Sequence, residues 1–128
     1  MWIFEWDERK EKANRRKHGI GFNEAETVFY DLHSITIPDP DHSLEESRFI
    51  DIGASDKNRL LIVIYTERDD RIRIISARKT TATERRRYET ENRQRTAENY
   101  KRSMLFRQEG DETAQGAFDR FGIRKVCL

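Results

Sequence analysis

The sequence has little that could cross-link the chain or anchor it in a membrane. Its one cysteine, Cys127, excludes a disulfide framework and a cysteine-based metal site. No apolar run approaches the roughly 20 residues that span a bilayer. The first seven residues lack the layout of a signal peptide. We therefore expect a soluble, cytoplasmic protein that makes no membrane contact.

Hydrophobic residues are also scarce, and charge is unevenly distributed. The 128 residues are 35% hydrophobic and 38% charged, which predicts one domain with a small core. The net charge of +1 conceals a basic half, because residues 71–102 hold eleven Lys/Arg against four Asp/Glu. Residues 31–57 hold seven acidic side chains against two basic ones. A basic half is typical of nucleic-acid binding, although basic helices also dock on acidic proteins.

Residues 71–88 predict a strand that leads directly into a basic helix. Arg71 and Arg73 alternate with Ile72 and Ile74, the period of a half-buried strand. Two interpretations remain open. The segment is either a structural corner with solvated arginines or a rigid cationic surface for a polyanion.

The basic helix is expected to begin near Ala82, after a capping box formed by Thr81 and Glu84. It can be long, because residues 83–100 contain neither glycine nor proline. We expect its first three turns to dock on the sheet and the later part to project or pack elsewhere.

Two shorter helices are expected before the sheet. Asp7 is the predicted cap of a helix over 8–17 that ends at Gly19, with Ala13 as its apolar side chain. Asn23 is the predicted cap of the second helix. The apolar stripe of that helix is Ala25, Val28, Phe29 and Leu32.

Four strands follow, near 35–37, 48–53, 59–67 and from residue 71. The third is apolar on both faces, which predicts a central position, and Asp69-Asp70 is the predicted hairpin turn into the fourth. Residues 2–6 also alternate in a way that allows a short strand. We expect an α+β fold with two N-terminal helices, a four-stranded antiparallel sheet and a C-terminal basic helix.

Several separated motifs resemble one family, the BrnT toxins of type II toxin–antitoxin systems. The resemblance covers residues 4–92, with the motifs in the same order and at compatible spacings. The motifs are Phe4-Glu5-Trp6-Asp7, Asn14 with Lys17-His18-Gly19-Ile20, Glu24-Ala25 with Val28-Phe29, Asp39-Pro40-Asp41-His42, Ile52-Gly53, and Arg73-Ile74-Ile75-Ser76-Ala77-Arg78 with Glu84-Arg85-Arg86 and Tyr88.

The resemblance implies a RelE/ParE-like fold, inhibition of translation by RNA cleavage, and neutralisation by a BrnA-like antitoxin. It also implies that DNA is bound only through the antitoxin complex, which represses its own operon. Members of the family usually stop soon after the position of Tyr88. We therefore divide the chain into a toxin domain, 1–92, and a helical extension of unknown role, 93–128.

RNA cleavage without a metal needs a proton acceptor for the 2′-hydroxyl, cations for the phosphorane and an acid for the leaving 5′-oxygen. No Asp/Glu/His cluster has clear metal-ligand spacing. The nearest is Asp39, Asp41 and His42, where the flanking prolines favour an anion-rich turn over a metal site. We expect no metal and no cofactor.

The expected catalytic cations are Arg73 and Arg78, because a strand fixes their direction and a guanidinium suits phosphate oxygens. Arg71 and Lys79 are expected to bind RNA. The alternative is a solvated strand face with a cross-strand pair between Glu67 and Arg71.

The candidates for proton transfer are His18, His42, Glu67 and Tyr65, with Lys17 as a stabiliser of charge. Each has a simpler alternative. His18 can cap helix carbonyls, His42 can make a loop hydrogen bond, Tyr65 can belong to the core, and Lys17 can be a solvated helix-end cation.

Arg85, Arg86 and Arg87 are successive helix positions and cannot share one face. We expect them mainly to face the antitoxin or to attract the RNA backbone. Composition leaves a rival function open: a non-catalytic module that binds RNA or protein and blocks translation by occupancy. DNA binding by this chain without a partner is weaker, because no helix-turn-helix pattern is visible.

Overall fold

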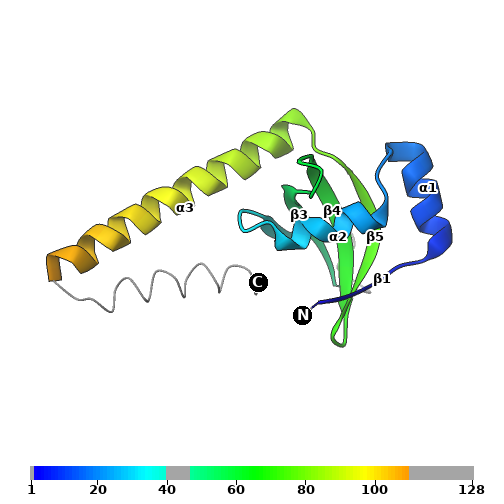
Figure 1. Cartoon of the computed structure of the whole chain (residues 1–128), viewed down its shortest axis with the longest axis horizontal. Helices are drawn as coiled ribbons and strands as arrows, with labels where there is room; N and C mark the ends of the chain where they lie inside the picture. The colour runs from blue at the N-terminus through cyan, green and yellow to red at the C-terminus, as the bar shows by residue number, and fades with distance from the viewer. Residues whose placement is uncertain (1, 40–46, 110–128) are drawn as a thin grey trace.

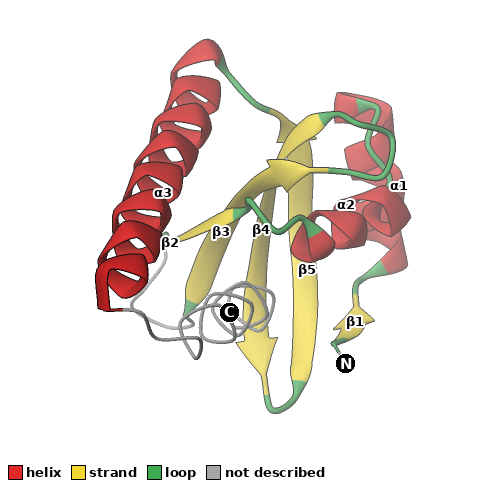
Figure 2. Ribbon diagram, turned by 60° about the vertical axis from the view of Figure 1, so that its left-hand side comes forward, coloured by secondary structure: helices red, strands yellow, loops and turns green. Residues whose placement is uncertain are grey.

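The computed structural model describes residues 2–39 and 47–109 and shows an α+β fold (Figures 1 and 2). Its elements in chain order are β1 (Ile3–Glu5), α1 (Glu8–His18), α2 (Phe22–Thr27), a 3-10 turn η1 (Val28–Tyr30), β2 (Ile35–Pro38), β3 (Arg48–Ala54), β4 (Leu60–Arg68), β5 (Arg71–Lys79) and α3 (Ala82–Glu109). Within these ranges, no helix is both long and apolar enough to cross a membrane.

The sheet has five strands in the order β1-β5-β4-β3-β2, so the expectation of four was wrong. The four expected strands do form an antiparallel meander with β4 at the centre. The additional strand, β1, pairs in parallel with β5, with Phe4 opposite Ile72. The alternation of residues 2–6 allowed a strand but could not reveal a partner so far along the chain.

The helices cover opposite faces of the sheet. Figure 2 shows α1 and α2 on one side and α3 on the other. The larger hydrophobic cluster lies under α1, α2 and η1, and consists of Ile20, Phe22, Ala25, Val28, Phe29, Leu61, Val63, Tyr65, Ile72, Ile74 and Ala77. The smaller cluster, on the α3 side, consists of Ile35, Ile52, Leu60 and Ile62, with Tyr88 packed against it.

Helix α1 has the predicted ends but a polar inner face. Asp7 accepts a hydrogen bond from the backbone N–H of Arg9 at 2.8 Å, and Gly19 has the left-handed φ of 72°. Ala13, however, is exposed, while Glu11 and Asn14 are buried. The expected apolar stripe was therefore wrong.

Asn14 ties α1 to the edge of β5. Its amide donates to the carbonyl of Ala77 and accepts from the N–H of the same residue, at 2.8 and 3.1 Å. It also donates to the carbonyl of Ile20 at 2.8 Å. These bonds extend the edge of β5 beyond β1 and satisfy backbone groups that would otherwise be buried without partners.

The second helix begins one residue before its predicted cap. Its N-cap position is Gly21, and the carboxylate of Glu11 accepts from the N–H of Phe22 at 3.3 Å. A side chain of α1 thus replaces the local cap expected from Asn23. The stripe of α2 and η1 is buried as predicted except for Leu32, which is 51% exposed.

Helix α3 has the predicted capping box. The Thr81 N–H donates to Glu84 Oε1 at 2.8 Å, and the Glu84 N–H donates to Thr81 Oγ1 at 3.2 Å. The helix runs from the end of β5 past the sheet (Figure 1). Up to residue 105, its distal half carries the exposed apolar side chains of Tyr100, Met104 and Leu105.

Polar bonds hold α3 to the loop between η1 and β2. They join Tyr88 Oη to Asp31 Oδ2 (2.9 Å), Asn92 Nδ2 to the His33 carbonyl (3.0 Å), and Arg95 Nη1 to the Ser34 carbonyl (3.2 Å). The Asp31 carboxylate also accepts from the N–H groups of His33 (2.9 Å) and Ala54 (2.8 Å). One carboxylate therefore links the loop, β3 and α3.

Candidate nucleic-acid interface

The two arginines predicted as catalytic are both held by carboxylates. Arg73 donates to Glu5 at 2.8 Å, and Arg71 lies 3.8 Å from the same carboxylate. Arg78 donates to both oxygens of Glu84, each at 2.8 Å. The bonds from Arg78 lower the pKa of Glu84 to about 2. These pairs fix the guanidinium directions but offset part of their charge.

The strand register does not place Glu67 opposite Arg71, as the alternative interpretation of this strand face required. The two-residue turn at Asp69-Asp70 places Arg68 opposite Arg71 and Glu67 opposite Ile72. Because side chains alternate along a strand, Glu67 lies on the opposite face of the sheet from Arg71 and Arg73. Glu67 therefore does not share a face of the sheet with these two cations.

Tyr65 belongs to the core. It is 3% exposed and donates to Asp51 Oδ1 at 3.0 Å, an atom that also accepts from Thr36 Oγ1 at 2.7 Å. Burial raises the pKa of Tyr65 well above its usual value and that of Asp51 to about 6. This network lies on the face of the sheet that α1 and α2 cover.

The remaining predicted residues are dispersed. Lys17 is exposed and His18 half-buried at the end of α1. Asp41 and His42 lie outside the described residues. In residues 2–39 and 47–109, no group of three or more His, Cys, Asp or Glu side chains is placed to hold a metal ion.

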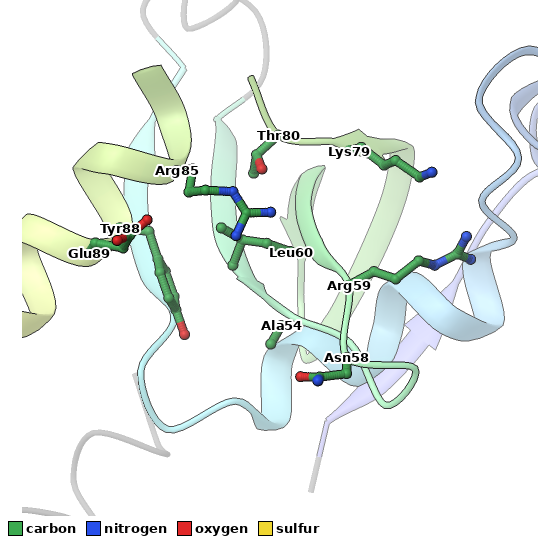
Figure 3. A pocket seen from close by; sticks show the side chains of 9 residues that line it. All are labelled: Ala54, Asn58, Arg59, Leu60, Lys79, Thr80, Arg85, Tyr88 and Glu89. Carbon is green, nitrogen blue, oxygen red and sulfur yellow. The ribbon is translucent and has the colours of Figure 1, made fainter. Parts of the chain in front are cut away.

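A cavity of about 540 Å³ lies where the β3–β4 turn, the end of β5 and the first turns of α3 meet (Figure 3). We call it the β5–α3 cavity. It is lined by Ala54, Asn58, Arg59, Leu60, Lys79, Thr80, Arg85, Tyr88 and Glu89.

The cations of this cavity differ in how they are engaged. Arg59 is committed to Glu24 through two hydrogen bonds, one of them 2.8 Å long. In the described part of the chain, no ion pair joins Lys79 or Arg85 to a carboxylate. Their charges remain available to an anionic ligand.

The cavity also holds a polar atom without a partner. The hydroxyl oxygen of Thr80 is buried and makes no hydrogen bond within the described residues. Such a group costs stability unless a ligand or water satisfies it. Thr80 follows directly after Lys79, and Figure 3 shows the Lys79 side chain extending away from this hydroxyl.

The cavity brings together residues for which the sequence predicted different roles. Lys79 was predicted to bind RNA and Arg85 to face the antitoxin, and both line it. Arg86 and Arg87 do not. Sequence reasoning missed Asn58 and Glu89 as lining residues. Helical spacing could have indicated Glu89, because positions 85, 88 and 89 share one face of α3.

Comparison with known proteins points to one family. The family model described as "Ribonuclease toxin, BrnT, of type II toxin-antitoxin system" matches residues 6–84. The crystal structure of the Brucella abortus ribonuclease toxin BrnT is similar in fold, with a TM-score of 0.51 at 24% identity, over 63% of this chain and 99% of that one. A search of curated proteins found no match. The chain therefore belongs to the BrnT family of ribonuclease toxins of type II toxin–antitoxin systems.

Proposed function

We propose that this chain is a metal-independent ribonuclease that cleaves mRNA and so inhibits translation. The observation that carries the proposal is the convergence of cations at the end of β5 in a chain of a ribonuclease toxin family. Arg78 is aimed by Glu84, and Lys79 and Arg85 flank the cavity. A RelE/ParE-like relationship of the fold is part of the same proposal.

In the proposed reaction, the 2′-oxygen attacks the adjacent phosphorus and the bond to the 5′-oxygen breaks, leaving a 2′,3′-cyclic phosphate. A base takes the proton from the 2′-hydroxyl, and an acid returns one to the 5′-oxygen. Arg78 stabilises the charge of the phosphorane. Arg73 lies five residues earlier on β5, roughly 15 Å away, and holds a neighbouring phosphate, as Arg71 and Lys79 do.

The proton-transfer groups remain predictions: Glu67, His18 and His42, with Lys17 as a stabilising cation. We add Glu89 as a candidate base. Among the described residues that line the β5–α3 cavity, it is the only one with a carboxylate. Its exposure lets a substrate reach it.

The test is the double variant Arg73→Ala/Arg78→Ala, assayed for cleavage of an mRNA with and without EDTA. We expect cleavage to fall by roughly 100-fold or more in the variant, and EDTA to leave the wild-type rate unchanged. Circular dichroism checks that the fold is retained. Purified wild-type protein that binds RNA but never cuts it would instead support the occupancy module.

The proposed partner is a BrnA-like antitoxin, with DNA bound only through the antitoxin complex, in the cytoplasm. Arg86 and Arg87 are exposed and lie outside the cavity lining, which suits an antitoxin-facing role. A short neighbouring reading frame whose product co-purifies with this chain would support the proposal. Replacing both arginines with alanine should then weaken the complex.

A further inference from the structure

We propose that the β5–α3 cavity takes one unpaired nucleobase of a single-stranded RNA and so helps to select where the strand is cut. The inference rests on the proposed ribonuclease function for its biological setting. Its physical basis is the cavity itself, which combines an apolar floor, an aromatic wall, a guanidinium and a buried hydroxyl that has no partner among the described residues.

Size is the first argument. The cavity volume of about 540 Å³ lies within the roughly 300–1,000 Å³ of small-ligand sites. A single nucleotide fits such a space, whereas a helix or a duplex does not. Single-stranded RNA is also the form whose bases can be splayed out into protein pockets.

The lining is the second argument. Leu60 and Ala54 provide apolar surface, and Figure 3 shows the guanidinium of Arg85 reaching over Leu60, with Tyr88 along the α3 wall. A flat base can stack on an aromatic ring or a guanidinium plane, and such stacking tolerates every base.

Polar atoms are the third argument. Thr80 Oγ1 is buried and without a partner in the described structure, and it can donate to or accept from a base edge. The amide of Asn58 lines the opposite rim from Arg85 (Figure 3). These two groups can discriminate between bases, which stacking cannot do.

Position along the chain joins the cavity to the chemistry. Lys79 and Thr80 directly follow Arg78, so a nucleotide in the cavity leaves its phosphates beside the cations of β5. An acidic protein segment would fit less well. A carboxylate inside the cavity would meet Glu89, whereas a nucleobase is neutral and leaves its charged phosphates outside.

The test uses the full chain and 2′-O-methyl RNA oligomers, which bind but cannot be cut. Affinity is measured by fluorescence anisotropy at one fixed salt concentration. Arg85→Ala is compared with Arg93→Ala, which removes the same charge from an exposed position of α3 outside the cavity lining. One oligomer contains a single abasic position, which keeps the phosphate and removes the base.

We expect Arg85→Ala to weaken binding about tenfold and Arg93→Ala no more than about twofold. The abasic oligomer should bind wild type more weakly and reduce the difference between the two variants. Thr80→Val should fold as well as wild type, because it removes an unpartnered hydroxyl, and should narrow the differences in affinity among oligomers of A, C, G and U.

Equal losses for the two arginine variants, with no effect of the abasic position, would overturn the proposal. So would a loss of antitoxin binding by Arg85→Ala with RNA affinity unchanged, or tighter binding of a free nucleoside monophosphate than of the oligomers. Cleavage of unmodified RNA is scored separately. Base-dependent binding by a wild-type protein that never cuts would overturn the ribonuclease proposal and support the cavity assignment.

Discussion

At the scale of single residues, the buried carboxylate of Asp51 carries a clear pH signature. Burial raises its pKa from 3.8 to about 6. The folded protein therefore binds a proton more tightly than the unfolded chain, and stability falls as pH rises from about 4 to above 6. Ionisation of Asp51 lowers the free energy of unfolding by roughly 2–3 kcal/mol over this pH range.

Replacing Asp51 with asparagine should remove that dependence. The amide oxygen can still accept from Thr36 and Tyr65, and no charge is buried. We expect the variant to gain stability over wild type above pH 6 and to match it near pH 4, as measured by urea unfolding across this range. A difference between the two proteins that is independent of pH would contradict the assignment.

Glu84 behaves in the opposite way. Its pKa is lowered to about 2, chiefly by the hydrogen bonds from Arg78. Its contribution is present above the unfolded pKa of about 4.5 and is lost as pH falls towards 2. Glu84→Gln keeps a side chain able to complete the capping box but loses the charge, whereas Glu84→Ala loses both.

We expect Glu84→Ala to cost about 1–2 kcal/mol at pH 7 and Glu84→Gln less than that. Both variants should lose the pH dependence between 4.5 and 2, measured as the free energy of unfolding. RNA cleavage should fall in both, because Arg78 loses the partner that aims it. Full cleavage activity in Glu84→Gln would show that the charge of Glu84 is not needed for RNA cleavage and that its role is to cap α3.

At the scale of the elements, α1 shows what polar side chains can do in a small core. Asn14 satisfies both backbone groups of Ala77. Asn14→Ala should cost about 3 kcal/mol, because three backbone groups, two of Ala77 and the carbonyl of Ile20, lose a buried partner. Arg16→Ala, at an exposed position of the same helix, is the matched control and should change unfolding by less than about 0.5 kcal/mol. Similar costs for the two variants would show that α1 is held in another way.

The elements that sequence reasoning could place are those with local signals. The capping box at Thr81, the left-handed Gly19 and the apolar run of β4 each act within a few residues. The missed features are long-range: β1 against β5, Glu11 capping α2, and Asn14 on Ala77. Polar residues that look solvent-facing in sequence become core residues only through partners far along the chain.

The candidate site was likewise predictable only where its signals are local. The alternation of β5 placed Arg71 and Arg73 on one face, and the cationic exit of that strand does reach a cavity. The register of β4 against β5 places Glu67 on the opposite face of the sheet. Arg73 and Arg78 have carboxylate partners, and Asn58 lines the cavity, only through tertiary contacts that no local pattern encodes.

At the scale of the whole molecule, the open question is where the toxin domain ends. The family model matches residues 6–84, while α3 continues without a break to Glu109. Division after residue 92 remains a prediction. Arg95 still donates to the Ser34 carbonyl, one turn beyond that boundary.

Two truncations can locate the boundary. A chain ending at Thr96 keeps the Arg95 bond and should unfold within about 0.5 kcal/mol of the full chain. A chain ending at Asn92 loses this bond and should be about 1 kcal/mol less stable. Both are measured by urea denaturation. A large loss on truncation at Thr96 would place later residues in the folded core.

The Asp31 carboxylate has a consequence for recognition. Two of its hydrogen-bond donors, Ala54 and Tyr88, also line the β5–α3 cavity from different elements. The spacing of these two walls is therefore set by one half-buried carboxylate that bonds to both. A base entering such a preshaped slot loses its own freedom but requires little ordering of the protein. Selectivity between bases would then come from the rigidity of the cavity. Replacing Asp31 should reduce the differences in affinity between bases, although Asp31 is not a lining residue of the cavity.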